Sequence, residues 1–242
     1  MVNIQKAAVI GCGFVGSTIA YTLMQKGLFS EMVLLDANKA KAEGEAMDIS
    51  HGLPFTHAMD IYAGEYEDIA DASVVIITAG ANQKPGETRL DLVQKNAAIM
   101  RSIIKEIKRV NCEGILLIVS NPVDILTEVA LRESGFPKER VIGSGTVLDT
   151  ARLKYIISEK LDVDSRNVHA FIVGEHGDSE LAAWSCANIY GIKLQDFAKM
   201  RGYEHFAQDM EEVYKGVRDS AYEIIERKGA TYYGIGMAAE KI

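Results

Sequence analysis

Short apolar runs alternate with longer amphipathic segments over roughly the first 145 residues of the chain. Short apolar runs predict buried strands, and apolar positions that recur every three or four residues predict helices. Strands separated by helical segments indicate parallel β/α units. The expected strands are 7–10, 32–35, 60–63, 74–78, 115–119 and 141–142, and the expected helices are 14–26, 39–51, 87–110 and 123–133.

The pattern of the chain changes after this region. The segment Thr146-Val147-Leu148-Asp149 predicts a capping box that opens a helix ending near Leu161. Beyond it, apolar positions at helical spacing predict a long amphipathic helix. The remaining expected elements are strands at 168–173 and 181–192, of which the second could also be a helix, the long helix at 206–224 and a last helix from Thr231.

Composition limits the classes of partner. The chain has 242 residues, of which 48% are hydrophobic, and a formal net charge of −8. This is enough for one large domain or two modest ones with a buried core. An acidic surface repels phosphate backbones and anionic lipids, so we expect neither a nucleic-acid nor a membrane partner. No apolar run reaches the ~20 residues that a membrane-spanning helix needs.

The chain ends and the cysteines bear on location. The N-terminal segment 1–6 lacks the basic start, apolar core and cleavage site of a signal peptide. Cys12, Cys112 and Cys186 are odd in number and far apart, which fits neither a disulfide framework nor a zinc site. We therefore expect a cytoplasmic protein with free thiols and no bound metal. The last helix stops at Ile242 without a cap or polar tail, which is typical of a truncated chain.

A glycine-rich turn follows the first expected strand. Its sequence, Gly11-Cys12-Gly13-Phe14-Val15-Gly16, has the form G-x-G-x-x-G and opens a helix, which is the context that dinucleotide binding requires. The first glycine allows the tight turn, the second lets the backbone approach a pyrophosphate, and the third lets the helix pack on the strand. Asp36 ends the next strand, where a carboxylate accepts hydrogen bonds from a ribose 2′-hydroxyl and repels a 2′-phosphate. The motif thus favours NAD over NADP, against the alternative of a glycine-rich turn that binds nothing.

These patterns together predict an α/β protein. We expect a Rossmann-type doubly wound parallel sheet over residues 1–144, which would bind NAD. We expect an incomplete α+β substrate domain over residues 145–242.

A second turn carries a candidate proton donor. His176 lies in Gly174-Glu175-His176-Gly177-Asp178-Ser179, directly after an expected strand. Flanking glycines leave room for a small molecule, and histidine, with an ordinary pKa of ~6.5, exchanges a proton near neutral pH. Most loop histidines are merely solvated, so the turn alone proves little. A proton donor combined with a hydride carrier nevertheless suggests a dehydrogenase.

Asp149 and Arg152 share one face of the helix after residue 146. One interpretation is an ordinary surface ion pair. In the other, Arg152 forks onto a substrate carboxylate, and Asp149 fixes the tautomer of the His176 imidazole and favours its protonated form.

Two further loops follow buried strands. The segment 80–90 is rich in glycine and polar residues, which predicts a mobile loop over a ligand crevice. Arg89 on this loop either polarises a substrate carbonyl or is a solvated residue at a helix start. Asn121, in Ser120-Asn121-Pro122, either holds a substrate oxygen or cofactor amide or initiates a turn.

In their order along the chain, these segments resemble the L-lactate/L-malate dehydrogenase family. The matching segments are GCGFVG, Asp36, AGANQKPGETRLDLVQKN, VSNPVD, GSGTVLDTARL, VGEHGDS and KGATYYGIG. The resemblance implies that His176 is the general acid/base with Asp149 as its partner. It also implies that Arg152 binds the substrate carboxylate, that Arg89 polarises the carbonyl, and that Asn121 and Thr231 line the site.

The loop residue Gln83 separates two reactions within the family. Malate enzymes typically place an arginine there for a second carboxylate, and a buried carboxylate without a cationic partner costs several kcal/mol. Gln83 therefore favours pyruvate over oxaloacetate. The resemblance implies reversible reduction of pyruvate to L-lactate with NADH; a malate dehydrogenase and a truncated, inactive NAD-binding chain are the alternatives.

The resemblance also implies partners. Bacterial relatives are commonly activated by fructose 1,6-bisphosphate, bound between subunits by an Arg and a His. His169 matches the histidine, but Lys154 stands at the arginine position and offers a point charge without a bidentate fork. We therefore hypothesise activation by this effector, and we expect a homo-oligomer, either a dimer or a tetramer.

Overall fold

The computed structural model describes residues 1–81 and 88–242 of the chain, and of Arg89 the backbone alone. The described residues form two compact units. The first consists of residues 1–144 together with 232–242, and the second of residues 145–231. Each unit is described by itself.

A six-stranded parallel sheet forms the centre of the first unit. Its strand order is β3-β2-β1-β4-β5-β6. This is the order of a Rossmann-type sheet, in which the direction of strand addition reverses beside β1. The predicted α/β fold with a doubly wound parallel sheet is therefore confirmed. The strands are β1 (Asn3–Ile10), β2 (Glu31–Leu35), β3 (Asp60–Ala63), β4 (Ala72–Ile77), β5 (Ile115–Ile118) and β6 (Val141–Gly143).

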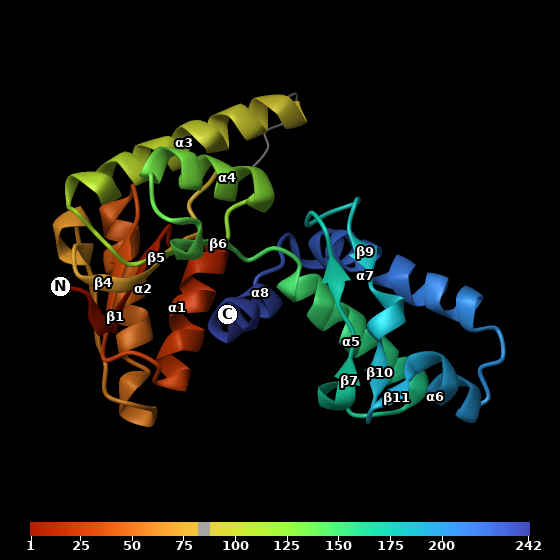
Figure 1. Ribbon diagram of the computed structural model, residues 1–242. Helices are drawn as coiled ribbons and strands as arrows, with labels where there is room; N and C mark the ends of the chain where they lie inside the picture. Colours follow the sequence, from red (N-terminus) through yellow and green to blue (C-terminus); the bar gives the residue numbers. More distant parts are fainter. Residues whose placement is uncertain (82–87) are drawn as a thin grey trace. The chain divides into compact units, whose positions relative to one another are not determined.

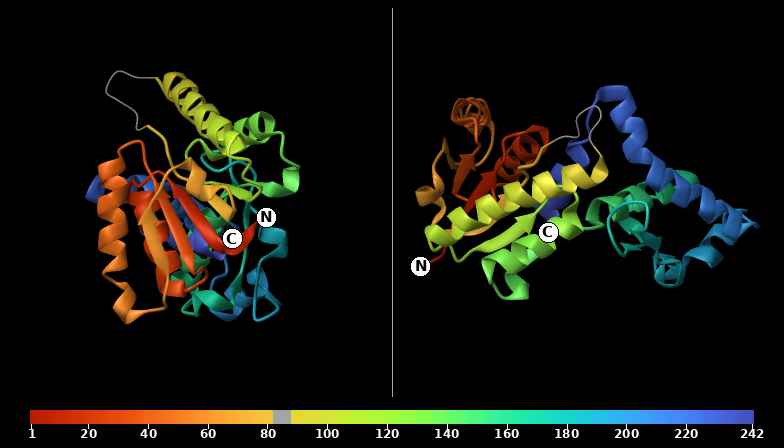
Figure 2. Two further views of the ribbon diagram at one scale, coloured as in Figure 1. Left: turned by 90° about the vertical axis from the view of Figure 1, so that its left-hand side faces the viewer. Right: turned by 90° about the horizontal axis from the view of Figure 1, so that it is seen from above.

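Helices cover both faces of this sheet (Figure 1). On β1, Ala8 and Ile10 pack towards α3 and α4, whereas Val9 packs towards α1, α2 and α8. Because both faces are buried, the strands are continuous apolar runs rather than alternating ones. The helices are α1 (Phe14–Lys26), α2 (Lys39–Ser50), α3 (Arg89–Arg109), α4 (Val123–Ser134) and α8 (Tyr233–Lys241). Of these, α3 and α4 lie side by side on one face (Figure 2).

Helix α3 begins two residues later than the pattern predicted. Thr88 is its N-cap, and the Thr88 hydroxyl accepts a hydrogen bond from the Asp91 N–H at 3.1 Å. In return, Asp91 accepts a bond from the Thr88 N–H at 3.0 Å. This capping box fixes the start of the helix at Arg89.

Helix α8 packs against α1 of the first unit, although the sequence prediction placed it in the second domain. The reason is a close approach at Gly236, where an added Cβ would lie 2.6 Å from the Thr18 methyl group. A glycine at this point lets the two helices meet. The helix also starts at Tyr233 rather than at Thr231.

The second unit is built on two long helices. Leu153 and Ile157 of α5 (Val147–Leu161) pack with Met210, Val213 and Val217 of α7 (Phe206–Lys228) in a buried core. Around them lie α6 (Leu194–Met200), a three-stranded sheet and a two-stranded sheet. The strands are β7 (Val168–His169), β8 (Ile172–Val173), β9 (Leu181–Ala182), β10 (Asn188–Ile189) and β11 (Ile192–Lys193).

The predicted strands of this unit are wrong in detail. Segment 168–173 is two short strands in different sheets, because β7 pairs with β10 whereas β8 pairs with β9. Segment 181–192 also divides, into β9, a 3-10 turn and the hairpin β10–β11. Tyr190 and Gly191 make its two-residue turn with positive φ angles of 55° and 80°, as such hairpins require. Helix α6 was not predicted, and α7 continues to Lys228, four residues further than expected.

Two further observations concern the whole described chain. None of its described helices is long and apolar enough to cross a lipid bilayer. Cys12, Cys112 and Cys186 are free thiols, of which the first two are buried.

Candidate active site

The three glycines of the turn after β1 differ in how closely other backbone atoms approach them. Gly11 has a φ of +103°, and a Cβ there would lie 2.6 Å from the Ala79 amide nitrogen. A Cβ on Gly16 would overlap the carbonyl oxygen of Gly11. At Gly13, by contrast, an added Cβ would meet nothing within 4 Å. The outer two glycines therefore permit close packing, and the middle one borders open space.

The N-terminus of α1 is available to an anion. Gly13 is the N-cap of the helix, and no side chain caps it. The first N–H groups of a helix lack intrahelical partners and carry a partial positive charge, which suits a pyrophosphate. The residues present at this turn therefore fit a bound dinucleotide.

Asp36 lies directly after β2 and is oriented by the same turn. One of its carboxylate oxygens accepts a hydrogen bond from the Cys12 N–H at 2.7 Å. The other accepts from the Asn38 N–H at 2.9 Å. These backbone donors fix the carboxylate at the carboxyl end of the sheet, where ligands of such folds bind.

Phe14 and Val15 follow the turn on α1. Val15 is half-buried, whereas Phe14 is 71% exposed. The Phe14 ring stacks on Tyr232 with its centroid 5.3 Å away. This contact was not predicted, because it joins two segments that are far apart in the sequence.

Asp149, Arg152 and His176 meet in the second unit. Asp149 Oδ2 lies 2.6 Å from His176 Nδ1, and Asp149 Oδ1 accepts a bond from Arg152 Nη1 at 2.9 Å. The Asp149 side chain is only 3% exposed, and those of Arg152 and His176 are 12% and 27% exposed. The two residues on α5 are thus no ordinary surface ion pair, because one buried carboxylate binds both cationic groups.

The electrostatics of this cluster favour a charged imidazole. The hydrogen bond to Asp149 raises the pKa of His176 against the opposing effect of burial. Burial raises the pKa of Asp149, but the hydrogen bond and charge of His176 and the charge of Arg152 outweigh it, so that the net direction is down. The cluster therefore keeps His176 protonated to a higher pH than an isolated imidazole.

The predicted capping box at the start of α5 is wrong for a reason that concerns this cluster. Thr146 is the N-cap, but it makes no side-chain cap bond. Its hydroxyl donates to the Ile172 carbonyl at 2.7 Å instead. The Asp149 carboxylate, which would have completed the box, binds His176 and Arg152.

Glu180 is a member of this cluster that the sequence did not reveal. It lies at the end of the His176 turn and is 3% exposed. One polar atom from each of Asp149, His176 and Glu180 lies within 4.8 Å of the other two. Burial and the charge of Asp149 raise the pKa of Glu180 to about 7. A polar residue in a loop gives no sign of burial in the sequence, so only its proximity in the fold identifies it.

Four further residues were predicted to belong to the site, and none of them is part of the Asp149 cluster among the described contacts. Gln83 is outside the described residues. The backbone of Arg89 forms the first position of α3, and Asn121 is an exposed residue before α4. Thr231 is half-buried at the end of the second unit.

Asn96 ties two of the expected loops together, and it was also missed. It is 4% exposed on α3. Its Oδ1 accepts a bond from the Ala81 N–H at 2.8 Å, and its Nδ2 donates to the Asn121 carbonyl at 2.9 Å. The sequence signal that could have identified it is an asparagine on the apolar face of an amphipathic helix, because a polar side chain that becomes buried there needs hydrogen-bond partners.

Lys154 and His169, the two residues predicted to bind the effector, do not contact each other among the described residues. The ammonium of Lys154 lies 5.7 Å from the centroid of the Phe171 ring. His169 is exposed on β7. No described contact joins them.

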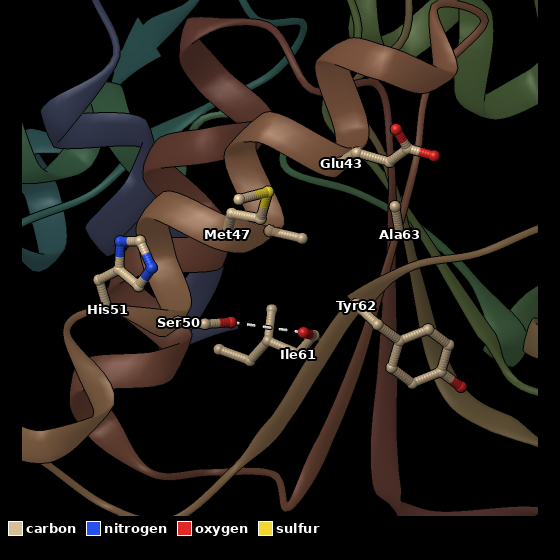
Figure 3. Close-up of a pocket in the computed structure, with 8 residues that line it drawn as sticks. Glu43, Met47, Ser50, His51, Ile61, Tyr62 and Ala63 are labelled. Carbon is tan, nitrogen blue, oxygen red and sulfur yellow. Dashed lines mark hydrogen bonds between the residues drawn. The ribbon is translucent and has the colours of Figure 1, made fainter.

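A groove between α2 and β3 contains none of the predicted site residues. Glu43 and Met47 line it from α2, His51 from the C-cap of that helix, and Tyr62 from β3 (Figure 3). The Ser50 hydroxyl donates a hydrogen bond to the Ile61 carbonyl at 3.4 Å.

The comparisons with known proteins cover both units. Residues 5–143 match the model of the lactate/malate dehydrogenase NAD-binding domain, and residues 146–242 match that of the lactate/malate dehydrogenase alpha/beta C-terminal domain. An L-lactate dehydrogenase of Acetivibrio thermocellus is 55% identical over 99% of this chain and 75% of its own length. One of Priestia megaterium is 55% identical over 98% of this chain and 74% of its own length.

Solved structures give the same result. MGS-M5, a lactate dehydrogenase from a Medee basin deep-sea metagenome library, has a TM-score of 0.96 and 54% identity. The match covers 100% of this chain and 76% of that one. The minor L-lactate dehydrogenase of Enterococcus mundtii has a TM-score of 0.94 and 48% identity, over 98% of this chain and 76% of the other.

Proposed function

The chain belongs to the lactate/malate dehydrogenase family, and we propose that Asp149, Arg152 and His176 perform its L-lactate dehydrogenase reaction on pyruvate. The reaction is pyruvate + NADH + H⁺ ⇌ L-lactate + NAD⁺. The observation that carries the assignment of roles is the buried 2.6 Å contact between His176 and Asp149, with Arg152 on the same carboxylate.

NAD is the cofactor of this family's N-terminal domain, which residues 5–143 match. We assign its binding to Gly11, Gly13 and Gly16 with Phe14 and Val15, to the N–H groups that open α1, and to Asp36. When bound, NADH supplies the hydride that reduces the keto carbon. The Asp36 carboxylate can accept a hydrogen bond from a ribose hydroxyl, and its negative charge repels a 2′-phosphate.

His176 exchanges the proton. With Nδ1 bound to Asp149, Nε2 is the nitrogen that donates to the oxygen of pyruvate during reduction and accepts the hydroxyl proton of lactate during oxidation. The buried Asp149 carboxylate fixes the tautomer of the ring and stabilises its protonated form. Both effects act on one step, the proton transfer.

Arg152 binds the substrate carboxylate. Its guanidinium has five N–H donors in a rigid fork. The bond to Asp149 uses Nη1 and holds the guanidinium at a fixed place, 2.9 Å from Oδ1. Its other donors match the two oxygens of a carboxylate.

The remaining assignments rest on the family resemblance. Arg89 polarises the substrate carbonyl, Asn121 and Thr231 line the site, and Gln83 selects pyruvate over oxaloacetate. Lys154 and His169 bind fructose 1,6-bisphosphate, in a cytoplasmic homo-oligomer that is a dimer or a tetramer. A pyruvate-saturation curve that the bisphosphate leaves unchanged would remove the effector from this scheme.

Steady-state oxidation of NADH tests the function. We expect turnover with pyruvate and far less with oxaloacetate; a preference for oxaloacetate would make the protein a malate dehydrogenase. Binding of NADH without turnover of either acid would support the alternative of an inactive NAD-binding chain.

The role of His176 has its own test. His176→Ala should lower turnover by about 10²–10⁴-fold and leave the Kd of NADH unchanged. His205→Ala, at an exposed histidine that precedes α7, serves as the control. Equal losses of turnover and NADH binding in His176→Ala would contradict the role.

A further inference from the structure

The second unit contains a buried carboxyl group that the proposed reaction does not use. Glu180 is 3% exposed, and one of its carboxyl oxygens lies within 4.8 Å of an Asp149 carboxylate oxygen and of a His176 ring nitrogen. Burying two carboxylates side by side is expensive when both are charged. Below neutral pH, one of the two therefore holds a proton.

The surroundings decide which carboxyl holds that proton. Asp149 binds His176 at 2.6 Å and Arg152 at 2.9 Å, so its negative charge has two cationic partners. The Glu180 carboxyl faces Asp149 and His176, each with a polar atom within 4.8 Å of it, and its backbone N–H donates to the Gly177 carbonyl at 3.0 Å. The Tyr214 hydroxyl of α7 donates to the backbone carbonyl of Glu180 and not to its carboxyl group. Asp149 therefore stays charged, and Glu180 takes the proton.

We propose that Glu180 is a positioning residue that holds a second proton beside the Asp149–His176 pair and extends pyruvate reduction to higher pH. This inference rests on the proposed function. Below neutral pH, Glu180 is a neutral acid that donates to Asp149. As the pH rises, Glu180 loses this proton, and the new negative charge stabilises the imidazolium of His176. His176 thus keeps the proton needed for reduction over a wider range of pH.

The direction of each charge effect agrees with this coupling. The ionised Glu180 raises the pKa of His176. Burial and the charge of Asp149 raise the pKa of Glu180 to about 7, whereas the positive charge of His176 lowers it. Because the two groups interact, their protons leave in steps that belong to the pair.

The variant Glu180→Gln tests the proposal. Glutamine keeps the shape and a hydrogen-bond donor for Asp149, but it does not ionise. We expect equal kcat/KM for pyruvate in variant and wild type at pH 6, where Glu180 is protonated. Above pH 7 the basic limb of the variant should lie about one pH unit lower, since a neighbouring charge shifts a pKa by this order. The variant would then be about tenfold slower at the same high pH.

Lactate oxidation should respond in the opposite sense. It needs a neutral His176, so its acid limb also moves to lower pH, and the variant gains activity between pH 6 and 7. A residue that merely supports the fold would lower activity in both directions at every pH. Glu175→Gln, on the same turn at an exposed position, is the matched control. An equal shift in this control would overturn the proposal, because solvent screens a charge there.

Two measurements do not depend on turnover. The His176 ring protons, followed by NMR, should titrate at lower pH in Glu180→Gln than in wild type. In wild-type protein labelled with ¹³C at the glutamate carboxyls, one resonance should titrate near pH 7. Superimposable His176 titrations, or glutamates that all titrate below about pH 5.5, would overturn the proposal even if the variant does not fold.

The remaining outcomes separate the two proposals. Wild-type turnover of pyruvate with identical pH profiles in Glu180→Gln would refute this inference alone. No turnover by wild type would refute the proposed function, while the NMR titrations still decide the coupling. Because Asp149, His176 and Glu180 are close enough to share a metal ion, tight binding of Zn²⁺ by wild type would replace the proton with a metal and overturn the inference.

Discussion

Replacing Asp149 with asparagine should remove the charge that keeps His176 protonated. In the native protein, the two Asp149 oxygens lie 2.6 Å from His176 Nδ1 and 2.9 Å from Arg152 Nη1. An amide preserves the shape of the side chain but has one oxygen, so it can accept only one of these two bonds. Two unit charges 2.6 Å apart interact by about 6 kcal/mol at an effective dielectric constant of about 20. Burial of the imidazole opposes this attraction. An opposite charge at such distances typically shifts a pKa by about 1–3 units, or about 1.4–4 kcal/mol.

The expected result of Asp149→Asn is a loss of pyruvate reduction that grows with pH. A raised pKa in the native enzyme keeps His176 protonated above its ordinary value of ~6.5. In the variant, the protonated fraction should fall by about 10–1,000-fold at a pH well above both pKa values, and by less at lower pH, and kcat/KM should fall with it. The assay is kcat/KM for pyruvate from pH 5 to 9, together with the Kd of NADH, which should not change.

The control for this prediction is Asp164→Asn. Asp164 also lies 2.6 Å from its cationic partner, Arg166, but the two side chains are 40% and 87% exposed. Solvent screens such a pair, so its loss should leave the profile unchanged. The reasoning is refuted if Asp149→Asn keeps the basic pKa of the wild-type profile within about 0.3 unit.

Three further outcomes are expected. Gly16→Ala should weaken NADH binding and lower the Tm, because its Cβ would overlap a backbone carbonyl, whereas Gly44→Ala, where a Cβ meets nothing within 4 Å, should do neither. Asn96→Ala should lower the free energy of unfolding in urea by about 1–3 kcal/mol, because it removes the hydrogen bonds to the part-buried Ala81 N–H and Asn121 carbonyl. Because Glu180 titrates at about 7 in the native chain rather than at 4.5, its contribution to stability is present below pH 4.5 and lost as the pH rises through 7. Wild type should lose about 3 kcal/mol across that window relative to Glu180→Gln; parallel curves would contradict the assignment. His176, whose pKa is also raised, adds a loss in the same direction in both proteins, and this loss is smaller in Glu180→Gln because the charge of Glu180 contributes to the raised pKa.

The sheet of the first unit could be predicted because both of its faces are buried. Residues such as Val9 and Ile10 are apolar whichever face they reach, so each strand is a continuous apolar run in the sequence. The order of the strands does not follow from such runs, since it depends on which strands pair across the sheet. The glycine motif supplied that information, because it marks the first β/α unit of a doubly wound sheet.

The second unit was harder to predict because its strands are only two residues long. Two residues do not establish an alternating pattern, and the unit's short helix, α6, buries only Leu194, Phe197 and Ala198. The contact among Asp149, Arg152 and His176 could nevertheless be predicted, since the family motifs surrounding Asp149 and His176 are specific. Glu180 lay within the same region and was missed, because its burial depends on α5 and α7 folding against its turn.

The failed capping box at Thr146 shows how this local structure serves the site. An N-cap side chain typically contributes about 1 kcal/mol to a helix, and α5 lacks that bond. The Thr146 hydroxyl instead binds the Ile172 carbonyl at 2.7 Å, and the Thr150 hydroxyl accepts a bond from the Ile172 N–H at 2.9 Å. Ile172 begins the strand that leads into the His176 turn, so these two bonds attach that strand to the helix that carries Asp149. The start of α5 thus lacks a local cap bond, and in its place the Thr146 hydroxyl helps to fix the distance between the Asp149 carboxylate and the His176 imidazole. A mutation at Thr146 should therefore change the pKa of His176 more than the stability of the helix.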